Sequence, residues 1–433
     1  MRVLYFVAAL VVAGPAFGAD SAMFRGDAQH SGLAKDTGVP TLNGVKWKFK
    51  TQAPVLSSPA VADGVIYFGS SDHSVYAVSA KTGEQVWKTR TGGRVVSSPA
   101  VVDGRVYIES YDSNLYALDA TTGEVKWKFK TAGEHRFTAR HLHGGEPAAE
   151  LMADPFDFYL SSPVVSQGVV YFGSGDGNIY AVHAATGELK WKFQTGDVVH
   201  AAPALANGML YVGSWDSFFY AIDAATGQQK WRYKTGEDHE IYNQVGIQSS
   251  AVVANGVVYF GCRDSNVYAL DAASGAERWK FNNKGSWVIS TPIVHAGKLY
   301  FTTSDSGTFQ ALHADSGLPV YSLKLKWPMF SSPAIAGNVL YIGSHSGKLL
   351  AVDLRFQKLA WEFATDGSKQ NGATYTTADG GPNYEAAFLD FFHDDMVVGV
   401  NKMLSVGAVL SSPAVVGDTI YFGSADGHLY AIG

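Results

Sequence analysis

Cysteine is almost absent from this chain, since Cys262 is the single thiol among 433 residues. One cysteine makes no internal disulfide, so side-chain packing must stabilise the fold. Cys262 ends the apolar stretch VVYFGC, and we expect it to be a small buried residue.

Charged residues are also scarce, at 17% of the chain, and the formal net charge is -6. No run of five or more Lys and Arg occurs, so we expect no nucleic-acid partner. No segment reaches about 18 unbroken apolar residues after the N-terminal region, and the sequence therefore predicts no membrane span.

The N-terminal residues MRVLYFVAALVVAGPAFGAD have the composition of an export signal. Arg2 precedes an apolar run from Val3 to Ala13, and small residues suited to cleavage follow, up to Gly18. We predict a signal peptide over residues 1–18 and a periplasmic or otherwise secreted mature protein. No cysteine follows the cleavage point, so we expect no lipid anchor.

Glycine and aromatic residues are abundant, with 47 Gly, 24 Phe, 22 Tyr and 10 Trp, which indicates many short strands and tight turns. A strand of the type VYFGS recurs eight times, at 66–70, 106–110, 170–174, 210–214, 258–262, 299–303, 340–344 and 420–424. Each copy has a Ser-Ser-Pro-type strand before it, and a YALDA-type strand and a Trp-x-Phe strand after it. A spacing near 40 residues suits the four strands of one propeller blade.

The repeat predicts an all-β, eight-bladed β-propeller with four-stranded antiparallel blades over residues 44–433, after an N-terminal segment at 19–43. The eighth copy stops at Gly433, after its third strand, whereas GVKWKFKT at 44–51 is a lone fourth strand. We expect these two parts to complete one blade, because that pairing removes exposed sheet edges.

Repeated polar and aromatic residues have a structural interpretation. An aspartate follows the second strand in seven copies, where it suits a hydrogen-bonded turn. The register positions are Asp72, Asp112, Asp176, Asp216, Asp264, Asp305 and Asp426. Seven tryptophans recur on the fourth strands, with Tyr321 in the eighth place, and we expect them to pack between blades.

Units such as ALDATTGEVKWKF and AIDAATGQQKWRY, with FRGDAQHSG after the signal, resemble the pyrroloquinoline quinone (PQQ)-like repeat family of β-propellers, within the quinoprotein alcohol dehydrogenase-like superfamily. The family includes quinone-dependent alcohol dehydrogenases, the propeller lipoprotein of outer-membrane β-barrel assembly, and exported binding-type proteins. The resemblance therefore specifies a fold more sharply than a function. This chain resembles an exported member without a lipid anchor.

The dehydrogenase members hold PQQ beneath a ring of two adjacent, disulfide-linked cysteines and coordinate calcium with carboxylates. One cysteine cannot make that ring. The first hypothesis is therefore a non-catalytic binding or scaffold protein without a cofactor. The alternative is a PQQ- and calcium-dependent alcohol dehydrogenase-type oxidoreductase, with Glu385 among the candidate calcium ligands; a metal-assisted enzyme and a small-molecule sensor also stay open.

Three inserts interrupt the repeat, near residues 133–160, 236–246 and 364–410. Each lies between the Trp strand of one blade and the first strand of the next, and equivalent joints share one end of a propeller. We expect the inserts to crowd over the channel there and to bind a protein or polymer ligand.

Metal ligands are conceivable in two of the inserts. His141 and His143 point the same way if their segment is extended, but an HxH pattern is a weak signal and loop packing explains it too. Asp390 and Asp394 lie in the third insert on a stretch with the pattern of a short helix, where a solvated helix face is the alternative.

Other residues near the same propeller end are candidates for ligand binding. The second insert groups His239, Glu240, Asn243 and Gln244, which suits a polar ligand or a loop that satisfies itself. Indole rings outside the repeat register stack on ligands when exposed, although packing under the inserts is an equal explanation. This second set is Trp215, Trp287, Trp327, Arg263, Tyr384 and Glu385.

Overall fold

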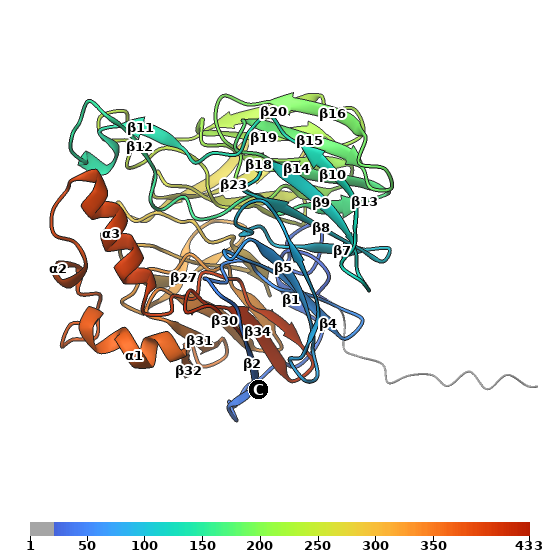
Figure 1. Cartoon of the computed structure of the whole chain (residues 1–433). Coiled ribbons are helices and arrows are strands. Elements are labelled where there is room, and N and C mark those ends of the chain that lie inside the picture. Colours follow the sequence, from blue (N-terminus) through green and yellow to red (C-terminus); the bar gives the residue numbers. More distant parts are fainter. Residues whose placement is uncertain (1–20) are drawn as a thin grey trace, which may run out of the picture.

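Eight sheets, each with four antiparallel strands, follow one another around a ring, and one of them gains a fifth, parallel strand from the N-terminal segment (Figure 1). The computed structural model describes residues 21–433, and the predicted signal peptide lies outside the described residues. Seven sheets take their strands in chain order, and the eighth takes its outermost strand from the N-terminal side. The predicted all-β, eight-bladed propeller is confirmed.

The blades are numbered here in chain order, and their strands are named from the channel outward. The innermost strands are β3 (Ala60–Ala62), β7 (Ala100–Val102), β13 (Val164–Ser166), β17 (Ala204–Ala206), β21 (Val252–Ala254), β25 (Ile293–His295), β29 (Ala334–Ala336) and β33 (Ala414–Val416). The second strands are β4 (Val65–Ser70), β8 (Arg105–Ser110), β14 (Val169–Gly173), β18 (Met209–Gly213), β22 (Val257–Gly261), β26 (Lys298–Thr302), β30 (Val339–Ser344) and β34 (Thr419–Gly423). The third strands are β5 (Ser74–Ser79), β9 (Asn114–Asp119), β15 (Asn178–His183), β19 (Phe218–Asp223), β23 (Asn266–Asp271), β27 (Thr308–His313), β31 (Lys348–Asp353) and β35 (His428–Ile432). The outermost strands are β6 (Gln85–Arg90), β10 (Val125–Lys130), β16 (Leu189–Gln194), β20 (Gln229–Lys234), β24 (Glu277–Asn282), β28 (Pro319–Lys324), β32 (Lys358–Ala364) and β2 (Val45–Lys50).

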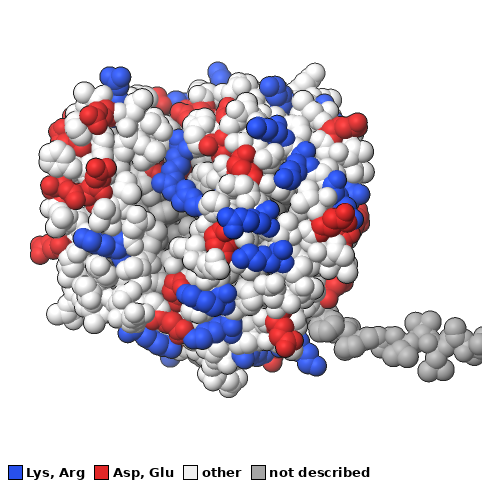
Figure 2. Space-filling model, in the orientation of Figure 1, with Lys and Arg blue, Asp and Glu red and all other residues white. Residues whose placement is uncertain are grey.

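Strand position within a blade explains strand composition. The second strand β14, with sequence VVYFG, is buried along its whole length because neighbouring blades cover both of its faces. The outermost strand β10, VKWKFK, alternates instead, with its lysines toward solvent. Charged side chains on an edge strand discourage pairing with another chain. Figure 2 shows Lys and Arg side chains spread over the outer surface of the blades.

The Ser-Ser-Pro and VYFGS motifs meet at the innermost turn of each blade. In the first blade the Gly69 N–H donates to Ser57 Oγ at 3.0 Å, and a Cβ on Gly69 would overlap Val95 of the next blade. The Ser58 N–H donates to Ser98 Oγ, again at 3.0 Å, which joins two neighbouring blades around the channel. Small residues therefore allow the close approach of the first two blades at this point.

Six of the seven repeated tryptophans donate to the next blade, as the sequence predicts, and Trp361 donates to the Val39 carbonyl of the N-terminal segment. Trp127 Nε1 donates to the Ala184 carbonyl of the third blade at 3.1 Å, and the Tyr107 hydroxyl donates to the same oxygen. The seven tryptophans in register that donate to a backbone carbonyl are Trp47, Trp87, Trp127, Trp191, Trp231, Trp279 and Trp361. A wholly structural role is therefore confirmed for them.

Six of the seven recurrent turn aspartates accept a backbone N–H from the segment that follows the preceding blade, and Asp305 is the exception. Asp112 accepts from the Asn114 N–H within its turn, from the Tyr116 hydroxyl, and from the Gly92 N–H at the end of the preceding blade. Burial alone would raise the pKa of Asp112, but these donors lower it below its usual value. The predicted structural role of Asp112 in its turn is confirmed. The sequence did not predict its hydrogen bond to the preceding blade.

The ring closes where the sequence predicts. Strand β2 pairs antiparallel with β35 in a register that places Val45 opposite Ile432 and Lys50 opposite His428. Gly44 and Gly433 exchange two backbone hydrogen bonds of 3.0 Å beyond the end of the ladder. Residues near both chain ends thus form one blade.

Residues 21–34 lie across the innermost strands at one mouth of the channel. Their carbonyls accept backbone hydrogen bonds from Val101, Leu205 and Val253, in the second, fourth and fifth blades. At the end of this segment β1 (Leu33–Ala34) pairs in parallel with β29. The N-terminal segment therefore links blades that are far apart around the ring.

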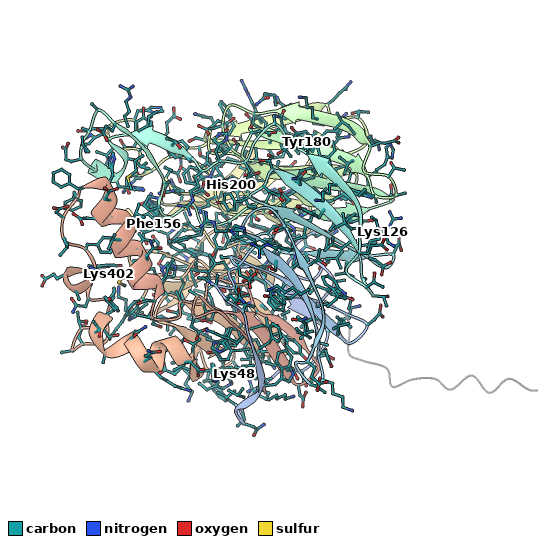
Figure 3. The ribbon with its side chains drawn as sticks, viewed as in Figure 1. Lys48, Lys126, Phe156, Tyr180, His200 and Lys402 are labelled. Atoms are coloured by element: carbon teal, nitrogen blue, oxygen red, sulfur yellow. The ribbon has the colours of Figure 1, made fainter. Side chains whose placement is uncertain are left out.

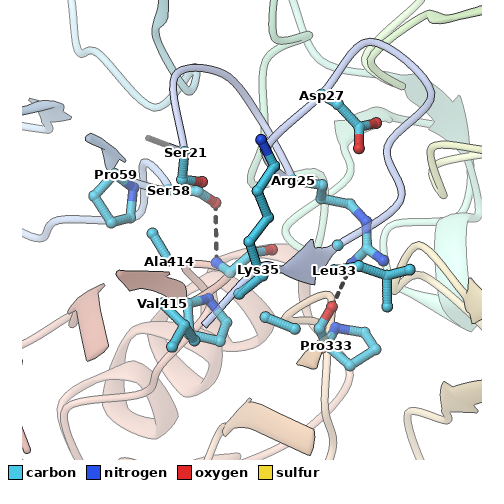
Figure 4. A pocket seen from close by; sticks show the side chains of 16 residues that line it. Ser21, Arg25, Asp27, Leu33, Lys35, Ser58, Pro59, Pro333, Ala414 and Val415 are labelled. Carbon is cyan, nitrogen blue, oxygen red and sulfur yellow. Dashed lines mark hydrogen bonds between the residues drawn. The ribbon is translucent and has the colours of Figure 1, made fainter. Parts of the chain in front are cut away.

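Arg25 is the centre of this segment (Figure 4). Its guanidinium is buried and donates to the carbonyls of Pro333 at 2.6 Å, Pro292 at 3.1 Å and His30 at 3.0 Å. Burial lowers the pKa of Arg25 to about 9, despite the nearby Asp27 carboxylate. A cavity of about 160 Å³ lies beside Arg25.

The helices of the described residues all lie in the third insert: α1 (Asp366–Tyr375), α2 (Tyr384–Ala387) and α3 (His393–Leu404). The first insert contains the two-stranded sheet of β11 (Thr138–Arg140) and β12 (Leu151–Ala153), with a 3-10 turn at Leu142–Gly144 between them. Figure 1 shows these elements at the same end of the ring. No helix within residues 21–433 is long and apolar enough to cross a membrane.

Candidate functional site

The three inserts contact one another through their backbones. The His143 N–H of the first insert donates to the Ile241 carbonyl of the second at 2.7 Å, and the Glu146 N–H donates to the Phe391 carbonyl of the third at 2.8 Å. Below them, Gln248 Nε2 donates to the Phe156 carbonyl at 3.0 Å. The inserts therefore form one connected layer over this end of the ring.

Beneath this layer is a cavity of about 520 Å³, which we call the insert cavity. Its walls are mainly apolar and aromatic and come from the first insert, from the loops of blades five to seven, and from α2 and α3. Its apolar members are Phe156, Phe158, Trp287, Pro328, Phe330, Tyr384, Phe388, Leu389, Phe391, Met396, Val400, Met403 and Leu404. A volume of this size suits a small ligand or one or two large side chains.

The polar lining of the insert cavity is mainly acidic. Asp305, Glu385 and Asp390 line it, and neither Lys nor Arg does. Two histidines also line it: His143, which contacts Asp154 at 3.2 Å, and His345, whose pKa burial lowers to about 3, so that the His345 imidazole is neutral. His345 packs on Phe330 with ring centroids 4.3 Å apart. The cavity is thus an apolar volume with three carboxylates and with neither Lys nor Arg in its lining.

Apolar side chains continue from the insert cavity onto the surface. Leu389, Phe391 and Phe392 are exposed by 76%, 69% and 54%, and Tyr384 on α2 is exposed by 44%. Tyr384 begins α2, the other three lie between α2 and α3, and all except Phe392 also line the cavity. We call these four residues the apolar rim.

The three tryptophans outside the repeat are not exposed. Trp215, Trp287 and Trp327 are all buried, so together they do not form an exposed stacking surface. Trp215 stacks on Phe137 of the first insert, and Trp327 Nε1 donates to the Gly380 carbonyl of the third. Trp287 alone among them lines the insert cavity.

Arg263 is fully buried and lies between the rings of Trp215 and Trp287, 4.7 and 3.9 Å from their centroids. Its Nη1 donates to Asp154 at 2.7 Å. Burial alone would raise the pKa of Asp154, but Arg263 and His143 hold it below the usual range. Arg263 therefore links the first insert to the fifth blade.

The proposed histidine pair does not have the geometry that its spacing suggested. His141 and His143 lie in the 3-10 turn with left-handed backbone angles, not in an extended segment. Both ring nitrogens of His143 have protein partners, Asn243 Oδ1 at 2.9 Å and Asp154 Oδ2 at 3.2 Å. Within residues 21–433, no group of three or more His, Cys, Asp or Glu is placed to hold a metal ion, and this includes Asp390 and Asp394.

The second insert mostly satisfies its own polar groups. His239 pairs with Glu237 at 3.0 Å, and the Glu240 carbonyl is 3.3 Å from His141 Nδ1. Asn243 lines the insert cavity, whereas Gln244 does not. The second insert is therefore held partly by its own residues and partly by His141 and His143 of the first insert.

Sequence reasoning missed a buried ionic group beside the channel. His200 Nδ1 contacts Asp157 Oδ1 at 2.8 Å, and its Nε2 contacts Glu134 at 3.0 Å. Burial alone would lower the pKa of His200, but the two carboxylates raise it to about 10. Because Glu134 and Asp157 lie near opposite ends of the first insert, the His200 imidazolium ties both ends to the fourth blade. Figure 3 shows His200 inside the ring and Phe156 beside α3.

Glu109 lies close to Glu134 of this ionic group, and sequence reasoning missed it as well. It occupies the Gly position of the VYFGS motif, in the variant VYIES. It is buried, its Oε1 has no hydrogen-bond partner among the described residues, and burial raises its pKa well above the usual value. The break in the repeated glycine was the signal that marked this position in the sequence.

The comparisons with known proteins define the family. A family model described as outer membrane protein assembly factor BamB matches residues 41–154, 150–280 and 239–382. This chain belongs to the PQQ-like repeat β-propellers. A comparison with curated proteins gives no match.

Solved structures of the family share the fold at low sequence identity. BamB from Moraxella catarrhalis is 16% identical, with a TM-score of 0.63, and the match covers 90% of this chain and 97% of that one. The quinohemoprotein alcohol dehydrogenase from Comamonas testosteroni is 15% identical, with a TM-score of 0.69 and coverages of 96% and 80%. A europium-containing methanol dehydrogenase is 15% identical, with a TM-score of 0.68 and coverages of 96% and 98%.

The residues present do not fit PQQ and its calcium. Between the innermost strands the channel cavity is about 40 Å³, room for a few waters, and Tyr159 crosses it to donate to the Leu410 carbonyl. The larger insert cavity is lined by carboxylates without Lys or Arg, whereas PQQ is itself a tricarboxylate. Cys262 is buried and has no second cysteine to make the ring that the dehydrogenase resemblance implied.

Proposed function

We propose that this chain is an exported, non-catalytic binding protein whose ligand occupies the insert cavity. The observation that carries the proposal is that the three departures from an otherwise regular repeat meet over one apolar volume of about 520 Å³. Ring closure is made by β2 and β35, and the inserts take no part in it. Loops held on a rigid scaffold are the usual place for binding residues.

The family supports a protein-interaction role. The matching family description is that of an assembly factor, which names no catalysed reaction. The structural neighbours that are dehydrogenases share the fold alone, at 15% identity. Export rests on the sequence of residues 1–18, and a periplasmic location follows from it as part of the same proposal.

A neutral apolar fluorophore, Nile red, tests the binding proposal on the mature protein. We expect saturable fluorescence enhancement that weakens at least tenfold in Tyr384→Asp and Leu389→Asp, because both residues line the cavity. Leu318→Asp is the matched control, since Leu318 is 63% exposed and lies outside the cavity lining. Equal binding by all four proteins would contradict the proposal.

The dehydrogenase alternative is tested in parallel. Titration with PQQ, with and without calcium, should give no calcium-dependent heat, and dye-coupled alcohol oxidation should give no turnover above background. Tight calcium-dependent binding with turnover would overturn the proposal of a non-catalytic protein.

A further inference from the structure

We infer that the insert cavity and the apolar rim together form a docking surface for a polypeptide segment that carries large apolar side chains beside Lys or Arg. This inference rests on the proposed function and adds the chemical class of the ligand. Three features support it: the shape of the cavity, the extent of the apolar surface, and the sign of its charge.

The cavity provides the place for an apolar anchor. Trp287, Phe330 and Phe158 line its interior, and all three are buried. Met396, Val400 and Met403 of α3 line the side toward the third insert. Methionine and aromatic side chains adapt their surfaces to different partners, and buried aromatic contacts contribute most of the binding energy at many interfaces.

The apolar rim favours a polypeptide over a small ligand. A small ligand would need only the enclosed volume, yet Leu389 and Phe391 lie at its edge and are still 76% and 69% exposed. Phe392 continues the apolar surface and does not line the cavity. Contiguous exposed apolar residues on a soluble protein usually mark an interaction site.

The charges around this surface favour a basic partner. Asp305, Glu385 and Asp390 line the cavity and form no ion pair within residues 21–433. Asp394 and Asp395 extend the negative charge along the first turn of α3. Asp390 raises the pKa of Asp395 by a side-chain hydrogen bond, a sign that these like charges lie close together.

The same charges argue against two other occupants. An anionic lipid surface would be repelled by these carboxylates, so charge complementarity selects a cationic segment instead. A second copy of this chain would have to offer its lysine-bearing outer strands, such as β10 and β20, to the rim. If a second copy were the occupant, the protein would self-associate, and substitutions in the apolar rim would prevent it.

The experiment is calorimetric titration of the mature protein with three short capped peptides. The first has two Trp flanked by Lys on both sides, the second has Glu in place of Lys, and the third has Ala in place of Trp. We expect measurable binding for the first peptide alone, and binding that weakens between about 50 and about 300 mM salt because screening shortens the range of the charges.

Protein variants locate the binding. Glu385→Gln combined with Asp390→Asn should weaken the Lys peptide about threefold to tenfold, whereas Glu188→Gln combined with Asp315→Asn should not, because neither control residue lines the cavity. Leu389→Ser combined with Phe391→Ser should abolish binding. The control for that pair is Leu318→Ser with Phe356→Ser, which are exposed by 63% and 67% elsewhere on the ring.

The outcomes separate this inference from the proposed function. Nile red binding without binding of the Lys peptide would refute the polypeptide partner and leave the binding protein. Equal affinity for the Lys and Glu peptides would refute the basic partner. If the unsubstituted mature protein bound neither Nile red nor the Lys peptide, the proposed function itself would be refuted. Light scattering could also show that the parent protein is a dimer and that the Leu389→Ser, Phe391→Ser double variant is a monomer. A second copy of the chain would then be the occupant, and the inference would be overturned.

Discussion

The buried pair of Asp154 and Arg263 should make a large contribution to stability that is visible in a single substitution. Both side chains have no exposed surface, and Asp154 Oδ2 is 2.7 Å from Arg263 Nη1. Arg263 Nε and Nη2 have no other hydrogen-bond partner among the described residues. Asp154→Asn removes the charge and leaves the guanidinium buried between two indole rings.

Breaking a buried ion pair in this way costs about 3–5 kcal/mol. The entropy of unfolding scales with chain length, at about 2.1 cal/mol/K per residue, which is about 0.9 kcal/mol/K for a chain of this size. The expected decrease in Tm is therefore about 3–6 °C. Urea denaturation at pH 7, followed by circular dichroism, measures the free-energy change, and calorimetry measures the shift in Tm.

A surface pair provides the matched control. Asp271 pairs with Arg278 at 2.8 Å, but both side chains are partly exposed, so Asp271→Asn should destabilise the protein far less than Asp154→Asn does. Adding Arg263→Met to Asp154→Asn should restore part of the loss, because an apolar side chain suits the space between Trp215 and Trp287. Equal stability of Asp154→Asn and Asp271→Asn would refute the reasoning.

Three further predictions concern the scaffold. Folding raises the pKa of His200 from 6.5 to about 10, so the ionised His200 contributes fully to the free energy of unfolding below pH 6.5, and this contribution is lost as the pH rises toward 10. Urea unfolding at several pH values should show the decline, and His200→Gln should make the free energy of unfolding less dependent on pH over this range. Gly261→Ala places a methyl group against the Val288 carbonyl and should lower the free energy of unfolding by about 1–3 kcal/mol. Gly372→Ala on α1 is the control and should leave the stability unchanged or raise it. A larger loss of stability in Gly372→Ala than in Gly261→Ala would contradict the packing argument. Deletion of residues 21–51 removes β2 and should abolish cooperative thermal unfolding, and a transition as sharp as that of the parent would refute closure as a requirement.

The fold was predictable because its determinants are local and repeated. Each VYFGS strand, turn aspartate and Trp strand occurs in a constant register, so a single interpretation applies to all the blades. Closure was predictable for a related reason: the strand at 44–51 lacks partners nearby and the final copy lacks a fourth strand. The N-terminal FRGDAQHSG segment was not, because Arg25 contacts blades distant in sequence and nothing local shows that it is buried.

The site was predictable only as a region. The position of the inserts within the repeat indicated one end of the ring, but not the contacts within the layer. Trp215 and Arg263 suggested ligand contacts, but both are buried and contact residues of the first insert, Phe137 and Asp154 respectively. Similarly, the spacing of His141 and His143 predicted an alignment that the left-handed turn removes. Long-range pairing decided each of these cases, and a single sequence does not record it.

The pairing of β2 with β35 has a consequence for the order of events during biosynthesis. The two partners in this blade are separated by almost the whole described chain, at residues 45–50 and 428–432. The early blades form from neighbouring strands as the chain emerges, but the edge at β33, β34 and β35 stays open until β2 returns to it. Residues 21–34 likewise cannot settle until the seventh blade exists to pair with β1. If the chain is exported while unfolded, completion of the ring must therefore wait until most of it has been translocated.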